Sequence, residues 1–358
     1  MPLHALRTPM PSPPTKGTWR TILVSGVALW VATVVVTFLT GNTNLLPTIV
    51  LLGSFLVPVT FVVWAYEHHH GGNVTVETLF SAFVVGGILG VLGASVLESY
   101  LLHPSPLVYL GVGAIEEFVK LLALLFVARD LTHRRRRDGI VLGATVGLGF
   151  AAFESAGYAL NSLVTAQGLD LVALVQTEIL RSLLVPVGHG LWTAILGGVL
   201  FAASSAGPTW RFTPGVVGTF AGVAVLHALW DSVHGIAIAL TLMFTGLPWG
   251  DLMLQIGRLP APTQAQANLV NLLEFVGLLV VGAIGLLWLW IVTMTGPGRR
   301  EANSATAPPG TAPRPGHGHA TGPARPAPTG QPGAPAAPDH PTGSERRGAP
   351  ETPEEPDD

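Results

Sequence analysis

Long apolar runs separated by short polar segments recur between residues 21 and 294. A helix of about 20 apolar residues is long enough to cross the hydrocarbon core of a membrane. Runs of that length predict transmembrane helices at 21–40, 46–66, 79–98, 107–128, 138–160, 183–204, 213–236 and 268–294. The pattern therefore predicts an all-α fold, a polytopic transmembrane bundle of about eight helices.

The N-terminal segment, residues 1–20, carries Arg7, Lys16 and Arg20 ahead of the first apolar run, as a secretory signal would. However, that run reaches spanning length, and no small-residue cleavage site precedes the polar residues 41–44. We therefore expect a retained membrane anchor rather than a cleaved signal. The predicted organisation is a cytoplasmic segment at 1–20 followed by a transmembrane domain at 21–296.

The C-terminal segment, residues 297–358, is rich in Pro, Gly and Ala with scattered charges. Such a composition cannot bury enough apolar surface to fold, so the sequence predicts a disordered cytoplasmic tail. Its His317 and His319, and the run His68–His70 in a short loop, are interpreted as solvated polar clusters rather than metal sites. The loop 245–266 is predicted to be extracytoplasmic, where it either gates a site or only connects two helices.

The orientation follows from the arginines. Eight spans place both termini on one side, and most basic residues fall on that side, namely Arg7, Lys16, Arg20, Arg129, Arg134, Arg135, Arg136, Arg137, Arg211, Arg299 and Arg300. Arg181 and Arg258 are expected on the opposite side. Because basic residues concentrate in cytoplasmic loops, we predict a multi-pass cell-membrane protein with both termini in the cytoplasm.

Composition narrows the chemistry. The 358 residues are 49% hydrophobic and 11% charged, too few charges for a water-soluble domain of this size. A net charge of -3 argues against nucleic acid as a partner. The chain has no Cys, which excludes disulfides, thiolate nucleophiles and Cys-ligated zinc. The lipid bilayer is the predicted environment.

Ionisable residues nevertheless lie inside the predicted helices, where each charge costs about 2.5 to 3.5 kcal/mol even on lenient insertion scales. They are Glu116, Glu117 and Lys120 in the fourth helix, Glu154 in the fifth, His189 in the sixth, and His227, Asp231 and His234 in the seventh. At about 1.5 Å per residue, the carboxylates and imidazoles lie about 8 to 14 Å from the outer ends of their helices. Four helices thus place them in one polar layer in the outer half of the membrane.

Two interpretations of this layer differ. In the structural one, pairs four residues apart, Glu116 with Lys120 and His227 with Asp231, hold helices together. That interpretation leaves Glu117 and Glu154 without an evident cation, although His189 alone could simply bind a carbonyl. Gly143 and Gly147 are expected to permit close helix packing.

In the catalytic interpretation, two adjacent carboxylates divide acid and base roles and imidazoles stabilise an oxyanion or bind a metal. Hydrolysis by water fits this layer. A covalent serine route fits less well, because the chain has no Gly-x-Ser-Gly run and Ser155 has no evident base. Neither Gly-x-Gly-Asp nor His-Glu-x-x-His occurs, which argues against intramembrane aspartyl proteases and zincins.

Four motifs in this region carry a family resemblance. They are E-E-x-x-K at 116–120, G-x-G-F-x-x-x-E at 147–154, Arg181 with H-G-L-W-T at 189–193, and H-x-x-W-D at 227–231. Together they resemble the PrsW family of intramembrane proteases, related to the CAAX-protease and bacteriocin-processing superfamily. The resemblance covers about residues 107–236, which form the motif core, and departs from the family pattern at Ser155, where Asn is expected.

The resemblance implies regulated proteolysis: hydrolysis of a peptide bond in a membrane protein substrate near the extracytoplasmic face, with a single-span anti-sigma factor as one candidate. Both a metalloprotease and a glutamate-dependent mechanism are compatible with it, so the cofactor is none or zinc. Zinc would bind at His189, His227 and Glu154, leaving a position for water. Without metal, Glu116 or Glu117 activates water while the histidines hold the oxyanion. We favour the metal-free route, because Lys120 beside the glutamates discourages a metal cation.

The predicted catalytic residues are therefore Glu116, Glu117, Glu154, His189, His227 and Asp231. In supporting roles, Asp231 orients His227 and Lys120 tunes the glutamates. Phe150 and Trp230 form the walls of the site, and Arg181 fixes a loop or a carboxylate at its outer mouth. The alternatives are a proton- or ion-coupled transporter, since such residues also form proton relays, and a non-catalytic membrane scaffold. Against a transporter, no paired half-repeat is evident.

Overall fold

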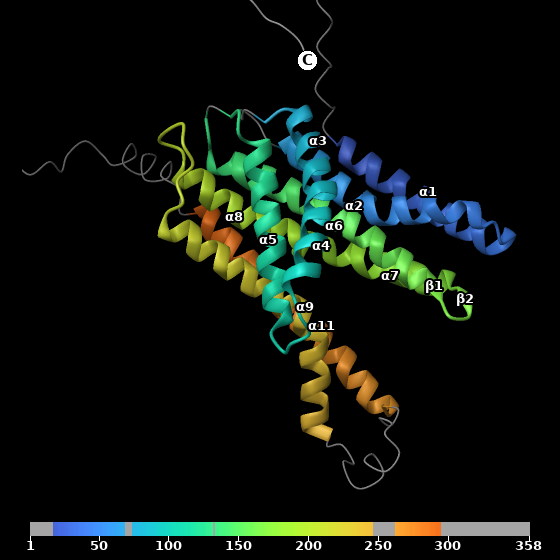
Figure 1. The fold of residues 1–358 in the computed structure, drawn as a ribbon. Helices are drawn as coiled ribbons and strands as arrows, with labels where there is room; N and C mark the ends of the chain where they lie inside the picture. The colour runs from blue at the N-terminus through green and yellow to red at the C-terminus, as the bar shows by residue number, and fades with distance from the viewer. Residues whose placement is uncertain (1–16, 69–73, 132, 246–261, 295–358) are drawn as a thin grey trace, which may run out of the picture. The chain divides into compact units, whose positions relative to one another are not determined.

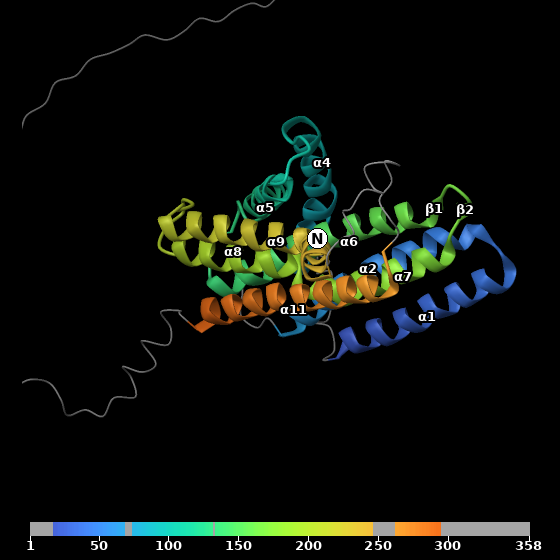
Figure 2. The same cartoon turned by 90° about the horizontal axis from the view of Figure 1, so that it is seen from below.

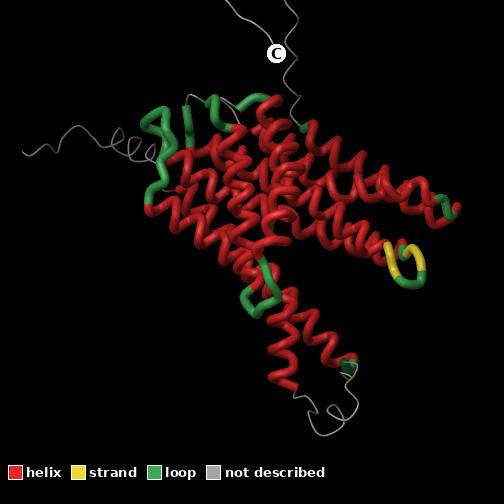
Figure 3. The backbone as a smooth tube through the Cα atoms, viewed as in Figure 1, coloured by secondary structure: helices red, strands yellow, loops and turns green. Residues whose placement is uncertain are grey.

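The structure is a computed structural model in which residues 17–68, 74–131, 133–245 and 262–294 are described. Within these ranges the chain is helical apart from short connections and one small hairpin, β1 (Val164–Thr165) with β2 (Gly168–Leu169) (Figure 3). The helices are α1 (Thr18–Thr40), α2 (Leu46–His68), α3 (Val76–Val84), α4 (Gly90–Leu101), α5 (Val108–Val127), α6 (Arg136–Leu163), α7 (Leu171–Leu184), α8 (His189–Ala203), α9 (Pro214–Thr245) and α11 (Gln264–Met294). Short helical segments η1 (Thr43–Leu45), η2 (Val85–Leu89) and η3 (Val185–Val187) connect some of them. The all-α prediction is confirmed.

Seven stretches of the described chain are long and apolar enough to cross a membrane. They are Thr18–Thr40, Thr43–His68, Val76–Leu101, Arg136–Leu163, Leu171–Ala203, Pro214–Thr245 and Gln264–Met294. The predicted helix at 107–128 is present as α5, whose apolar sequence is interrupted by Glu116, Glu117 and Lys120. The protein is a multi-pass membrane protein. The predicted tail at 297–358, with His317 and His319, lies outside the described residues, as do His69, His70 and 246–261.

Helix α7 is the main departure from the predicted elements, which left residues 161–182 as a loop. Asp170 caps this helix by accepting a hydrogen bond from the backbone N–H of Ala173 at 2.9 Å. At 14 residues α7 alone is shorter than a membrane span, and Glu178 and Arg181 interrupt its apolar sequence, so it was not assigned as a separate span. The consequence is that Arg181 lies on a helix rather than on a loop.

Helix α6 is central, because it packs against α8 on one side and against α2 and α7 on the other (Figures 1 and 2). Glycines make the α6–α8 contact close. A Cβ atom at Gly143 would collide with the carbonyl oxygen of Thr193, and one at Gly147 with that of His189. The predicted packing role of Gly143 and Gly147 is confirmed. This contact fixes the start of α8, and therefore His189, against α6.

A second close contact sets α5 against α9. A Cβ atom at Gly113 would lie 2.5 Å from the carbonyl oxygen of Ala224 and 3.1 Å from the backbone nitrogen of Ala228. The two backbones therefore approach each other where α5 carries Glu116 and α9 carries His227. Buried residues further along α5 and α8, such as Leu124, Trp192 and Ile195, belong to the main hydrophobic core.

Candidate functional site

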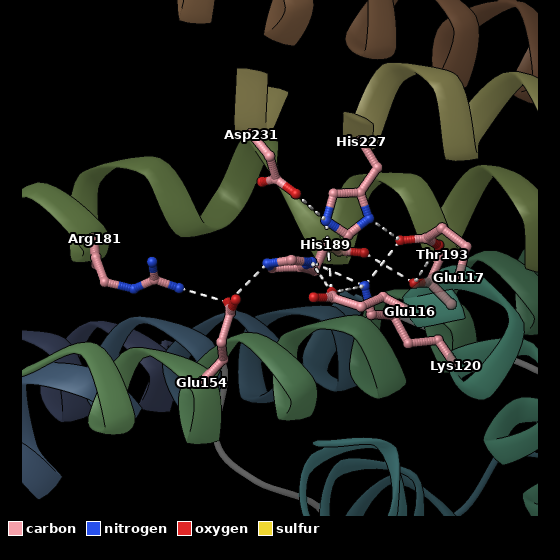
Figure 4. Close-up of polar contacts among 9 residues, drawn as sticks. All are labelled: Glu116, Glu117, Lys120, Glu154, Arg181, His189, Thr193, His227 and Asp231. Atoms are coloured by element: carbon pink, nitrogen blue, oxygen red, sulfur yellow. Dashed lines mark hydrogen bonds and ion pairs between the residues drawn. The ribbon is translucent and has the colours of Figure 1, made fainter. Parts of the chain in front are cut away.

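Five helices bring eight of the predicted residues into one connected group (Figure 4). This polar cluster consists of Glu116, Glu117 and Lys120 on α5, Glu154 on α6, Arg181 on α7, His189 on α8, and His227 and Asp231 on α9. The four helices that were expected to share one polar layer bring these residues together, while the depth of the layer in the membrane stays a prediction. His234 is separate, because it lies 2.8 Å from Glu274 of α11 and its side chain is 62% exposed.

Lys120 lies at the centre of the cluster and is fully buried. Its Nζ donates to Glu117 Oε1 at 2.9 Å, to Glu116 Oε2 at 3.2 Å and to His189 Nδ1 at 2.9 Å. The ammonium also lies 4.2 Å from the centre of the Phe150 ring. The three N–H groups of the ammonium therefore each have an acceptor.

His189 bridges Lys120 and Glu154. Its Nε2 lies 2.9 Å from Glu154 Oε2, on the side opposite the Nδ1 that faces Lys120. A lysine ammonium only donates, so Nδ1 carries the lone pair and Nε2 carries the proton that Glu154 accepts. Arg181 holds Glu154 in turn, with Nη2 2.6 Å from Glu154 Oε2 and Nε 2.8 Å from Ser155 Oγ.

His227 faces three carboxylates. Its Nδ1 lies 3.0 Å from Glu117 Oε1, while its Nε2 lies 3.5 Å from Glu116 Oε2 and 3.4 Å from Asp231 Oδ2. Among the described residues, Nε2 is buried without a hydrogen-bond partner. A buried ring nitrogen without such a partner is rare in proteins, and this one is available to a water, an ion or a reacting group.

Two premises of the sequence analysis need correction. Glu117 and Glu154 were expected to lack a cation, but Lys120 lies 2.9 Å from Glu117 and Arg181 lies 2.6 Å from Glu154. The pair of Lys120 with Glu117 was overlooked because Lys120, four residues from Glu116, was assigned to Glu116 alone. The pair of Arg181 with Glu154 was overlooked because α7 was not predicted. Pairing alone therefore no longer separates the structural from the catalytic interpretation.

Three residues, Glu116, His189 and His227, each offer one atom that could bind a metal, and these atoms lie within 4.8 Å of one another. The contacts of Glu116 with the two rings are from its Oε2 to His189 Nδ1 and to His227 Nε2. The set predicted from sequence contained Glu154 in place of Glu116. In the structure Glu154 contacts the far nitrogen of His189, so it orients the ring instead of sharing a ligand position with it.

The two distances from Glu116 Oε2 to the histidine nitrogens are close to those between zinc ligands. Zinc ligands at about 2.0 to 2.1 Å in tetrahedral geometry lie about 3.3 to 3.5 Å apart. Glu116 Oε2 lies 3.5 Å from His227 Nε2 and 3.6 Å from His189 Nδ1. Both imidazoles also place their second nitrogen on a carboxylate, as metal-binding histidines do.

A small cavity of about 80 Å³ opens the cluster to solvent-sized molecules. Its lining includes Glu154, Tyr158, Arg181, His189, Trp230 and Asp231. Residues that line this cavity are more exposed than the others in the cluster. The side chain of Asp231 is 25% exposed and that of Glu154 is 19% exposed, whereas those of Glu117 and Lys120 are fully buried. The cluster is therefore most accessible on the side of Asp231 and Glu154.

The two predicted wall residues both lie at the site. The Phe150 ring lies 5.3 Å from that of His189, and Trp230 lines the cavity and packs against Trp192. Sequence reasoning did not assign roles to Tyr158, which follows Glu154 by one turn, or to Thr193, which follows His189 by one turn. Thr193 Oγ1 lies 3.5 Å from Glu117 Oε2. Their helical spacing from assigned residues was the available signal.

Comparison with known proteins agrees with the motifs. A family model described as PrsW family intramembrane metalloprotease matches residues 74–253. The chain is 28% identical over 191 residues to Protease PrsW of Halalkalibacterium halodurans, covering 51% of this chain and 82% of that protein. It is 32% identical over 120 residues to Protease PrsW of Geobacillus kaustophilus, covering 33% of this chain and 48% of that protein. No solved structure matches the chain. Because the family match covers half of the chain and every residue of the polar cluster, this protein belongs to the PrsW family of intramembrane proteases.

Proposed function

We propose that this membrane peptidase hydrolyses a peptide bond of a membrane-associated protein near the extracytoplasmic face, with Glu116 activating the water. The convergence of three groups on one carboxylate oxygen supports this proposal. Glu116 Oε2 lies 3.2 Å from Lys120 Nζ, 3.5 Å from His227 Nε2 and 3.6 Å from His189 Nδ1. A base, a fixed positive charge on Lys120 and a nitrogen of His227 that can donate a hydrogen bond therefore meet at one point.

In the proposed reaction, Glu116 Oε2 accepts a proton from water while the water oxygen attacks the carbonyl carbon of the substrate. The carbonyl oxygen becomes negatively charged, and a protonated Nε2 of His227 donates a hydrogen bond to it. Transfer of the proton from Glu116 to the amide nitrogen then breaks the C–N bond. The products are a carboxylic acid and an amine.

The remaining residues hold these groups in position. Glu117 anchors Nδ1 of His227, so that Nε2 of the ring faces Glu116 and Asp231. Arg181 holds Glu154, which orients His189. Such fixed geometry contributes strongly to catalysis, because misplacement by about 1 Å can cost about 100-fold in rate.

Glu116, His189 and His227 are the residues that would hold a zinc ion. When bound, zinc supplies Lewis-acid activation of water and of the scissile carbonyl. We retain the metal-free route as our proposal, because the Lys120 ammonium contacts both Glu116 and His189 and so competes with a metal for them. On the zinc route the side chains of Glu116, His189 and His227 would hold the metal, whereas the metal-free route uses Glu116 as the base and His227 Nε2 as the donor. Glu117 and Glu154 orient the two imidazole rings on either route.

Reconstitution with a substrate tests the proposal. Purified protein is placed in liposomes with a single-span membrane protein tagged at both ends, and the cut is mapped by mass spectrometry. A single-span anti-sigma factor is the first candidate, as the resemblance suggests. We expect cleavage near the extracytoplasmic face by the wild type and none by the Glu116→Ala/Glu117→Ala variant.

Three other outcomes would contradict parts of the proposal. Equal cleavage by both proteins would reject the catalytic assignment. A cut on the cytoplasmic side would reject the predicted orientation of the cluster, and with it the cytoplasmic placement of the termini. A transporter or a scaffold predicts no cleavage by the wild type, although the double variant would still lose stability.

Chelation separates the two routes. We expect exhaustive treatment with a zinc chelator, followed by its removal, to leave the cleavage rate unchanged, because the proposed base and hydrogen-bond donors belong to the protein. Metal analysis of the same sample checks that zinc has been removed. Loss of activity on chelation with recovery on adding zinc would overturn the metal-free route while leaving the proposed peptidase activity in place.

A further inference from the structure

Lys120 makes one contact that the proposed chemistry does not use. Its ammonium pairs with Glu117 at 2.9 Å and lies 3.2 Å from Oε2 of Glu116, the proposed base, and it also donates to His189 Nδ1 at 2.9 Å. Lys120 Nζ thus contacts both Glu116 Oε2 and His189 Nδ1. These two atoms belong to two of the three residues that could hold a metal.

We propose that the Lys120 ammonium and a zinc ion bind this site in mutually exclusive fashion, so that Lys120 acts as a built-in cation in the metal position. The first argument concerns His189. A neutral imidazole has a single lone pair in the ring plane, and the lone pair of Nδ1 accepts the N–H of Lys120. A metal needs that same lone pair, so binding it requires Lys120 to leave His189.

The second argument concerns charge. An ammonium 3.2 Å from Glu116 Oε2 repels a divalent cation placed on that oxygen, and burial leaves little solvent to screen the repulsion. Lys120 has no exposed surface and packs over the Phe150 ring at 4.2 Å. The side chain therefore has no solvent-filled space into which to withdraw.

The third argument concerns which contact can be released. Glu117 Oε1 lies 2.9 Å from Lys120 Nζ and does not belong to the metal-binding set. If zinc binds, Lys120 keeps this partner and gives up the other two. Zinc binding would thus break two hydrogen bonds of Lys120 but leave its ammonium paired with Glu117. We therefore expect Lys120 to weaken zinc binding but not to abolish it.

The test is the zinc affinity of the full-length protein in detergent, measured by competition with a chromophoric chelator. We expect Lys120→Met to bind one zinc ion about 10- to 100-fold more tightly than the wild type, the range over which groups around a metal site change affinity. Adding His227→Ala to Lys120→Met should remove the gain, because it deletes a donor. Equal affinities of wild type and Lys120→Met would overturn the proposal.

Two further variants make the test specific. Arg181→Met removes a neighbouring positive charge that contacts Glu154 but no metal donor, and we expect it not to raise zinc affinity. If Arg181→Met and Lys120→Met gained equally in zinc affinity, removal of any nearby positive charge would explain the gain. That result would contradict competition between Lys120 and zinc for the lone pair of His189 Nδ1. Lys120→Gln removes the charge but can still donate to Glu117, so it provides the same comparison if Lys120→Met does not fold.

The inference concerns the site of the proposed peptidase but is tested without substrate. Tighter zinc binding by the Lys120 variants would support it even if no cleavage were found. Conversely, metal-free cleavage by the wild type would not rescue it if Lys120→Met bound zinc no better. Failure of the inference and failure of the proposed function are therefore distinguishable.

Discussion

Replacing Glu116 by Gln is expected to lower kcat about 1,000-fold with little change in KM, because the amide keeps the shape of the side chain but cannot accept the proton from water. Glu116 is the residue on which Lys120, His189 and His227 converge, and it lies at 3.2 to 3.6 Å from all three. The measurement is the initial rate of cleavage in liposomes over a range of substrate concentrations.

Glu117→Gln is the matched control, since it makes the same chemical change at the adjacent residue. Glu117 is fully buried and contacts Lys120 and His227, so its role is to position them. We expect a smaller loss, about 100-fold or less, because the base itself remains. A larger loss for Glu117→Gln than for Glu116→Gln would exchange the roles assigned to the two glutamates.

The polar layer could be predicted from sequence because two simple rules determine it. Ionisable side chains are costly in a membrane, so those that occur indicate a site, and the rise per residue converts their position into depth. Glu116, Glu154, His189 and His227 were placed at similar depths in this way, and the structure brings them together. Depth does not depend on how the helices are rotated.

Rotation could not be predicted, and it decides which atoms meet. The close approach at Gly113 turns Glu116 toward His227, and the contact at Gly147 fixes His189 so that its two nitrogens face different carboxylates. For this reason sequence reasoning placed Glu154 rather than Glu116 in the metal set. The partner of Glu154 was missed because Arg181 lies on α7, a helix of 14 residues that is too short to be assigned as a membrane span by itself.

The protein belongs to the PrsW family of proteases, yet three glutamates of its polar cluster are paired with Lys120 or Arg181. Lys120 and Arg181 neutralise Glu117 and Glu154, so the cluster resembles a set of structural ion pairs. Ion pairs that only hold helices together would not need His227 Nε2, which has no hydrogen-bond partner among the described residues, or the cavity bordered by Asp231. These two features favour the proposed reactive site over purely structural ion pairs.

His227 provides the second large expected effect. Replacing it by Gln is expected to lower kcat about 100- to 1,000-fold, the loss seen when one donor to an oxyanion is removed. Its Nε2 is the atom that faces Glu116 and Asp231 and lacks a partner among the described residues. The measurement is the same initial rate, together with thermal stability in detergent to check that the variant folds.

His234→Gln is the matched control for His227→Gln, because both residues lie on α9 and both variants lose an imidazole near a carboxylate. His234 pairs with Glu274 at 2.8 Å, is largely exposed and lies outside the polar cluster. We expect its cleavage rate to stay within about twofold of the wild type, because the imidazole contacts none of the groups proposed to act on the substrate and surface substitutions rarely change stability by more than about 0.5 kcal/mol. If the two variants lost activity equally, the effect would arise from α9 as a whole. Only a loss confined to His227→Gln supports the assignment of Nε2 as the group that stabilises the oxyanion.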